Sequence, residues 1–445
     1  MAREKKEAAL TPEERLKAAL VPDWEWPYKL PGNWCWTTVG AINQYVGISA
    51  DPTKAKNKTF ELYSVPSSAD NYPEIVLGAD IGSTKQSVKK GDVLLCKINP
   101  RINRVWKVSK YTDHSLLASS EWIVIRNSGL ISNYLMWCFR SPYFRGYMLS
   151  NVSGVGGSLM RAQPKFVQGY PVPVPPLPEQ QRIVDRIESL FSKLDEAKEK
   201  AQAVVDSFET RKAAILHKAF TGELTAKWRE EHGVSIDNWK TTRFDSVAAI
   251  RSNLVDPAEY QSFPHIAPDN IEKKTGVLLE YHTIAEDGVT SGKHRFYSGQ
   301  ILYSKIRPYL SKAVVVDFDG LCSADMYPIE AYQNARCLWY YMLSDEFLLQ
   351  ASTAGSRSVL PKINQKELSA LTVHLPTNDR EQEEIARILD ELFDKEQQTK
   401  EAAEVVLDQI DLMKKSILAR AFRGELGTND PSEESAVELL KRTIL

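Results

Sequence analysis

Apolar residues recur every three or four positions along residues 179 to 224, and the same pattern returns along residues 381 to 426, offset by 202 positions without a gap. This period predicts two long amphipathic helices, each with a coiled-coil seam. The polar residues Glu396 and Thr399 interrupt the second seam and predict a wetter centre. The predicted seam positions are Ile183, Ile187, Leu190, Leu194, Val204 and Phe208 in the first copy, and Ile385, Leu389, Leu392, Val406, Ile410, Met413 and Ile417 in the second.

Two apolar stripes in one chain are most simply buried against each other. We therefore expect an intramolecular pair of long antiparallel helices. At 1.5 Å per residue the pair would be roughly 60 to 70 Å long, about twice one turn of duplex DNA. The alternative is that each helix only caps its own domain.

The segments before the two helices also repeat. GDVLLCKINP (91 to 100) corresponds to GQILYSKIRP (299 to 308), and each predicts a turn glycine, a buried strand and an exit stopped by proline. Asn33-Trp34 and Asn238-Trp239 open the two segments. A glycine- and serine-containing loop followed by a cation comes later in each, and an apolar strand then leads into the helix.

This order predicts an α+β fold, with two mixed α/β heads separated by two long antiparallel helices in a pseudo-two-fold, circular arrangement. The N-terminal arm would stand where the linker after the first helix stands, which brings the chain ends together. The expected segments are an N-terminal arm (1 to 29), a first head (30 to 178), a central helix and linker (179 to 238), a second head (239 to 378), and a C-terminal helix and tail (379 to 445).

The net charge of −2 conceals a difference between the heads. Residues 30 to 178 carry 16 Lys and Arg against 8 Asp and Glu, whereas residues 239 to 378 carry 14 against 15. An anion-binding surface on the second head would therefore need local clustering. Five cysteines without C-x-x-C spacing predict buried thiols, and the absence of a long apolar run predicts a cytoplasmic protein with no membrane partner.

Catalytic motifs are missing from the sequence. It contains neither G-x-G-x-x-G nor a complete phosphate-binding loop, its histidines show no metal-ligand spacing, and we predict no metal site and no cofactor bound by this chain. Asp269 and Glu272 leave open a nuclease site, although such a pair more often marks a turn. We expect a protein without catalytic residues of its own.

The whole pattern resembles a type I restriction-modification specificity subunit. The resemblance rests on PVPVPPLPEQQRIV (171 to 184) entering the first helix, on the endings KAFTGEL (218 to 224) and RAFRGEL (420 to 426), on TAKWR (225 to 229), and on the Lys-Ile-x-Pro strand exits. It spans residues 10 to 426. Asn99-Pro100 departs from the commoner Arg-Pro, and TNDREQEEI (377 to 385) lacks the proline-rich approach.

The resemblance implies two target-recognition domains, each reading half of a split sequence in double-stranded DNA. The helices would dock two methylation subunits, which bind S-adenosylmethionine and methylate adenine. Complexes that also contain two restriction subunits would add cleavage that depends on ATP and Mg²⁺. The alternative from the residues alone is a coiled-coil scaffold that binds proteins and has no DNA specificity.

Cations around the strand exits and the later loops are the candidate DNA contacts, because register on a duplex comes from cations on phosphates. The candidates in the first head are Lys85, Lys89, Lys90, Lys97, Arg101, Arg104, Lys107, Arg161 and Lys165, and those in the second are Lys305, Arg307, Tyr309, Lys312, Arg357 and Lys362.

Overall fold

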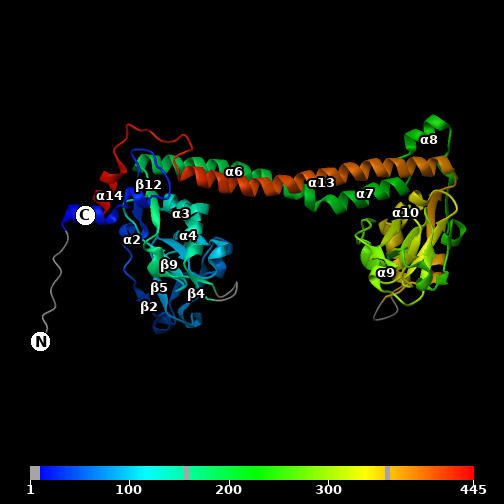
Figure 1. Cartoon of the computed structure of the whole chain (residues 1–445), viewed down its shortest axis with the longest axis horizontal. Helices are drawn as coiled ribbons and strands as arrows, with labels where there is room; N and C mark the ends of the chain where they lie inside the picture. The colour runs from blue at the N-terminus through cyan, green and yellow to red at the C-terminus, as the bar shows by residue number, and fades with distance from the viewer. Residues whose placement is uncertain (1–10, 155–159, 356–360, 445) are drawn as a thin grey trace. The chain divides into compact units, whose positions relative to one another are not determined.

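The computed structural model describes residues 11 to 154, 160 to 355 and 361 to 444. It divides into two compact units (Figure 1). Unit 1 comprises residues 1 to 200 and 406 to 445, and unit 2 comprises residues 201 to 405. The long helix α13 (Asp379–Ala421) contributes its first part to unit 2 and its last part to unit 1.

Unit 1 contains the first head, built on a five-stranded sheet of order β2-β5-β8-β3-β4 and a three-stranded sheet of order β7-β6-β9. The short pairs β1-β12 and β10-β11 are antiparallel, and β3-β8 is parallel. Its strands are β1 (Cys35–Thr38), β2 (Ser49–Ala50), β3 (Thr59–Tyr63), β4 (Glu74–Leu77), β5 (Lys85–Ser87), β6 (Val93–Cys96), β7 (Val105–Lys107), β8 (Ser115–Ala118), β9 (Trp122–Ile125), β10 (Val152–Ser153), β11 (Arg161–Ala162) and β12 (Pro171–Val174). Its helices are α1 (Pro12–Ala19), α2 (Val39–Ile42), α3 (Ser132–Arg140), α4 (Pro142–Ser150), α5 (Pro164–Val167), α14 (Ala436–Ile444) and most of α6 (Leu177–Asp206).

Unit 2 repeats this plan. Its five-stranded sheet has the order β15-β18-β21-β16-β17 with β16 and β21 parallel, and its four-stranded sheet has the order β14-β22-β19-β20. Its strands are β13 (Trp239–Arg243), β14 (Ala248–Ile250), β15 (Leu254–Val255), β16 (Pro264–Ile266), β17 (His282–Thr283), β18 (Lys293–Phe296), β19 (Ile301–Ser304), β20 (Ala313–Val315), β21 (Gly320–Cys322), β22 (Met326–Ala331) and β23 (Thr372–Pro376). Its helices are α7 (Phe208–Phe220), α8 (Ala226–His232), α9 (Ile284–Asp287), α10 (Ala335–Met342), α11 (Asp345–Ala354) and α12 (Gln365–Ala370).

The predicted intramolecular helix pair is confirmed, with α13 packed along α6 and α7 (Figure 1). The ion pair Lys198–Asp411 (3.2 Å) joins α6 to α13 in unit 1. The ion pair Arg211–Glu396 (2.7 Å) joins α7 to α13 in unit 2 and places Glu396 at a polar point of the helix pair. In both units the residue numbers of the partners run in opposite directions, so the helices are antiparallel.

Apart from Met413, twelve seam residues were predicted, and eleven of them are buried or half-buried. The half-buried ones are Leu190, Leu194, Val204, Leu392 and Ile417. The prediction for Val406 is wrong, since this side chain is 40% exposed, and Met413 is 49% exposed. Leu407 and Lys414 are less exposed than these neighbours, and Ile410 is buried. After Ala403 the buried stripe of α13 therefore includes Leu407 and Lys414 in place of Val406 and Met413 but keeps Ile410, because a straight helix drifts from a strict heptad frame.

The first long segment is two helices, not one. At Ser207, between α6 and α7, the hydroxyl donates to the carbonyl of Ala203 (2.6 Å), and the Arg211 guanidinium donates to the carbonyl of Val204 (3.2 Å). The carbonyl of Ala203 also accepts the amide of Ser207 (3.1 Å), whereas that of Val204 accepts the Arg211 guanidinium, and the helix is interrupted at this serine.

Each head is joined to its long helix by a buried glutamate. In unit 2, Glu381 is fully buried and accepts hydrogen bonds from Thr225, Arg229, Asn238 and Trp239. Burial alone would raise the pKa of Glu381, but the four donors together lower it below its usual value.

Unit 1 builds the matching junction from both ends of the chain. Glu179 is fully buried and accepts from Thr428 (2.7 Å) and Arg182 (2.8 Å), while Trp34 donates to Asn429 (3.2 Å). The helices α1 and α14 contact each other, so the two described ends of the chain meet in this unit. Thr428, which donates to Glu179, belongs to the C-terminal tail. The N-terminal arm was expected to take the place of the linker that carries Thr225 in unit 2, but it does not supply this threonine.

Candidate nucleic-acid interface

The two strand exits share an unusual backbone. Asn99, after β6, has φ 46° and ψ 63°, and Arg307, after β19, has φ 49° and ψ 60°. Asn103 and Ser311 end the two following turns and are also left-handed. Non-glycine residues rarely adopt this conformation, and when they do they cluster at functional sites. The repeat therefore preserves a costly backbone shape although the side chains differ.

In each head the structure brings the strand exit together with the segment that follows the glycine- and serine-containing loop. The amide of Asn99 donates to the carbonyl of Met160 (2.8 Å), and the amide of Arg307 donates to that of Pro361 (2.7 Å). Isolated β-bridges join Ile98 to Arg161 and Ile306 to Lys362. The two groups of predicted residues thus form one surface in each head, which we call the exit-loop surface (residues 97 to 104 with 160 to 165, and 305 to 312 with 361 and 362).

The cations on these surfaces differ in whether they are exposed or already paired with a carboxylate of the protein. Arg101, Arg307 and Tyr309 are exposed on the turns. Arg161 pairs with Glu121 (3.3 Å) and Lys362 with Asp325 (3.2 Å). A polyanion would have to compete with these two carboxylates for the paired cations.

Other predicted contacts are engaged within the protein. The Lys107 ammonium donates to the side chain of Asn133 (2.5 Å), that of Lys312 to the carbonyl of Pro268 (2.6 Å), and that of Lys305 to the carbonyl of Ala324 (2.5 Å). These bonds hold the ammonium groups against their own head. Such residues shape the turn more directly than they offer a charge to a ligand.

The remaining candidates lie at the margins. Lys85 donates to Ser83 (2.5 Å), and burial lowers its pKa. Lys89 and Lys90 are exposed in the turn before β6, and Lys165 is exposed beside the ring of Phe166. Lys97 and Arg104 are half-buried. Arg357 lies outside the described residues.

Sequence reasoning missed the carboxylates Glu121 and Asp325. Each directly precedes the strand that pairs with the exit strand, β9 or β22. Each backbone carbonyl accepts from the backbone amide of the lysine at the strand exit, Lys97 (2.9 Å) or Lys305 (3.0 Å). Within the described residues, Asn99 Oδ1 and Glu121 Oε2 are buried acceptors without a hydrogen-bond partner. The signal that could have found them is the faint match of ASSEW (118 to 122) with CSADM (322 to 326).

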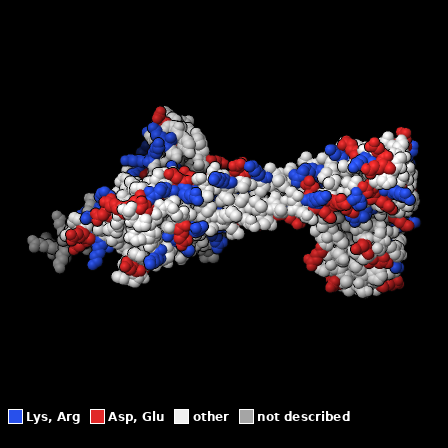
Figure 2. Space-filling view, turned by 90° about the horizontal axis from the view of Figure 1, so that it is seen from above, with Lys and Arg blue, Asp and Glu red and all other residues white. Residues whose placement is uncertain are grey.

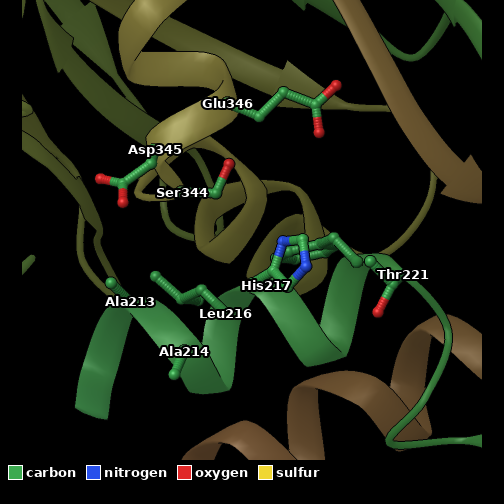
Figure 3. A pocket seen from close by; sticks show the side chains of 9 residues that line it. Ala213, Ala214, Leu216, His217, Thr221, Ser344, Asp345 and Glu346 are labelled. Carbon is green, nitrogen blue, oxygen red and sulfur yellow. The ribbon is translucent and has the colours of Figure 1, made fainter. Parts of the chain in front are cut away.

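A pocket of about 350 Å³ lies elsewhere in unit 2, between α7 and the start of α11 (Figure 3). His217 lines it from α7, and Ser344, Asp345 and Glu346 line it from the other side. None of the predicted cations lines this pocket. The carboxylates at its edge are unfavourable for a polyanion.

Among the described residues, neither the distribution of charge nor the grouping of metal-ligand side chains favours another candidate site. The face shown in Figure 2 mixes Lys and Arg with Asp and Glu side chains. Among the described residues, no group of three or more His, Cys, Asp or Glu could hold a metal ion, and the five buried cysteines are unpaired as predicted. Asp269 lies in the 3₁₀ turn Pro268–Asn270, 3.8 Å from the Lys312 ammonium. No helix in the described part of the chain has the length and apolarity of a membrane span.

Comparison with known proteins identifies the repeat. The family model described as "Type I restriction modification DNA specificity domain" matches residues 48–205 and again residues 236–406. The EcoDI type I restriction enzyme specificity subunit of Escherichia coli is 36% identical over 345 residues, which cover 73% of this chain and 76% of that protein.

Solved structures share the fold. The HsdS subunit from Thermoanaerobacter tengcongensis aligns with a TM-score of 0.63 at 20% identity, covering 90% of this chain and all of that one. A chain from a study of complex assembly and conformational transition in the type I R-M system aligns with a TM-score of 0.70, also at 20% identity and with the same coverage. Since the family model matches both halves of the chain and the EcoDI subunit exceeds a third identity, the chain belongs to the type I restriction modification DNA specificity family.

Proposed function

We propose that the two exit-loop surfaces bind double-stranded DNA and that each head reads one half of a bipartite target. The chain is a non-catalytic specificity subunit of a type I restriction-modification complex, as its family membership implies. We propose residues 30 to 178 and 239 to 378 as the two target-recognition domains. The observation that carries the proposal is the repeated left-handed turn at Asn99 and Arg307, packed in each head against a segment with a cation.

The exposed residues of these turns are the leading DNA contacts. Arg101 and Arg307 each present a guanidinium, which can contact a phosphate or bind a guanine edge through two hydrogen bonds. Tyr309, 47% exposed, offers a hydroxyl and a ring on the same turn. We propose that Arg161 and Lys362 exchange Glu121 and Asp325 for phosphates when DNA binds.

We further propose that two methylation subunits assemble with the chain in the cytoplasm, together with two restriction subunits. S-adenosylmethionine would belong to the methylation subunits, and ATP with Mg²⁺ to the restriction subunits. A protein-binding scaffold without DNA specificity is not favoured, because the family model that matches both halves is a DNA specificity domain.

DNA binding by the complex with methylation subunits tests this proposal. Arg307→Ala should weaken binding by about 1 to 3 kcal/mol if the guanidinium reads a base, and should lower the salt dependence by roughly one unit of slope if it contacts a phosphate. Lys227→Ala is the matched control, because this α8 side chain is 86% exposed and lies outside the exit-loop surfaces. Equal affinities for the original chain and the Arg307 variant at every salt concentration would contradict the proposal.

A further inference from the structure

A slot beside the long helices is filled in unit 2 by a segment of the second head. The Lys212 ammonium, on α7, donates to the main-chain carbonyls of Lys274 (2.8 Å) and Thr275 (3.1 Å). The amide of Lys274 donates to the carbonyl of Leu310 (3.1 Å), at the end of the strand-exit turn. A turn of the main chain, left-handed at Lys274 (φ 64°), therefore joins the long helix to the exit turn.

The fit in unit 2 requires a glycine. Gly276 has φ +76°, and a Cβ atom there would lie 2.3 Å from the ring of Trp339, on α10. Phe393 completes the slot, with the Lys212 ammonium 5.5 Å from its ring centroid. The slot thus accepts main chain and small residues and has little room for a side chain.

Unit 1 contains the same walls. Lys414, Trp137 and Phe191 correspond to Lys212, Trp339 and Phe393 at the constant offset of 202 residues. The Lys414 ammonium lies 5.1 Å from the ring centroid of Phe191, and Trp137 packs on Phe191 at 5.1 Å. Ile102 and Asn103 stand where Leu310 and Ser311 stand, at the end of the first exit turn.

These walls enclose an open groove in unit 1. Among the described residues it has a volume of about 730 Å³ and is lined by Ile102, Asn103, Trp137, Phe191 and Lys414, with Gly146 at its side. Lys414 contacts the carboxylate of Asp195, whereas Lys212 in unit 2 donates to main-chain carbonyls. The first head has a shorter connection between β3 and β4 (residues 64 to 73) than the second has between β16 and β17 (residues 267 to 281), so it lacks the segment that fills the slot in unit 2.

The charge of the groove also differs from that of the filled slot. Arg140 and Lys415 line it where the second copy has Met342 and Ala213. The Arg140 guanidinium donates to the carbonyl of Val105 in its own head (2.8 Å), and Lys415 is exposed. Arg145 lines it as well, and its buried Nε has no hydrogen-bond partner within the described residues. Such cations would attract the carboxylates of a peptide whose main chain lay in the groove.

We propose that this groove of unit 1 binds an acidic peptide segment of a methylation subunit, in a turn like the one that fills the slot of unit 2. Its carbonyls would accept from Lys414, and a glycine or other small residue would lie against Trp137. The inference rests on the proposed assembly with methylation subunits. It also makes the two units unequal, because unit 2 fills its own slot.

A photo-cross-linking amino acid at position 146 tests the proposal in the purified complex of the full chain, methylation subunits and duplex DNA. An added Cβ at Gly146 meets no atom within 4 Å, so the site tolerates a side chain. We expect a cross-link to one methylation-subunit peptide. The same group at Trp24, which is 84% exposed and outside the groove, is the control and should not give that cross-link.

Two substitutions give an independent measurement. Gly146→Trp, which blocks the groove, and Lys414→Gln, which removes the ammonium, should each weaken binding of the methylation subunit at unit 1 at least tenfold. Lys212→Gln should leave assembly unchanged, because its carbonyl partners belong to the same chain.

Cross-linking to DNA, or no cross-link from position 146 in an assembled complex, would overturn the inference and leave the proposed function standing. If the unaltered chain did not bind the methylation subunit at all, the proposed function would fail and this inference with it.

Discussion

Replacing the buried glutamate at the junction between head and helix should cost more free energy in unit 2 than in unit 1. Glu381→Gln removes the charge that faces Arg229, whose side chain is only 10% exposed and whose ion pair with Glu381 is 2.7 Å long. Removing one partner of a buried ion pair costs about 3 to 5 kcal/mol, because the other charge stays buried without compensation. Glu179 faces Arg182, which is 39% exposed. In Glu179→Gln, Arg182 would keep its 2.8 Å ion pair with Glu433. We expect the second substitution to cost only about 1 to 2 kcal/mol.

Hydrogen exchange measured by mass spectrometry can report each junction separately. The amides of β13 and the start of α13 report on unit 2, and those of β1 and the start of α6 report on unit 1. Glu381→Gln should speed exchange in the first set by two orders of magnitude or more, at about 1.4 kcal/mol per factor of ten. Equal protection losses at the two junctions, or a larger loss for Glu179→Gln, would refute the argument from burial.

Four further substitutions test other parts of the structure. Burial lowers the pKa of Lys212 to about 8, so the folded chain binds fewer protons than the unfolded chain between pH 8 and about 10.5. Stability should therefore rise with pH across that window by up to about 3 kcal/mol, and thermal denaturation of Lys212→Met should lack this rise. Ile187→Asp, at a fully buried position, should destabilise the helix pair by several kcal/mol, whereas Val406→Asp should cost well under 1 kcal/mol in urea denaturation. Gly129→Ala places a Cβ 2.1 Å from the Thr443 hydroxyl and should release α14, seen as faster amide exchange there with little change in β1.

The sequence predicted the features that depend on periodic burial. The seam from Ile183 to Leu194, the buried strands β6 and β19 and the helix pair follow from spacing alone. Val406 was misplaced because a strict heptad was continued through Glu396 and Thr399, where the straight helix drifts. The break at Ser207 depends on side-chain bonds to carbonyls, which hydrophobic spacing does not reveal.

The candidate interface was predicted less completely. The sequence grouped Arg101 and Arg307 with their strand exits, but it did not show that Arg161 and Lys362 would lie beside those exits and pair with Glu121 and Asp325. Lys107 and Lys312 are equally basic in the sequence, and only the fold shows that their ammonium groups bond within their own heads. Such contacts join residues far apart in the chain, and spacing alone does not predict them.

The central claim is that each head reads its own half of the DNA target. It is tested most directly by exchanging residues 30 to 178 for the corresponding segment of the EcoDI subunit and mapping the adenines methylated by the assembled complex. We predict two separated half-sites, of which only one changes in sequence. A single continuous site, or a change in both half-sites after exchange of one head, would contradict the account.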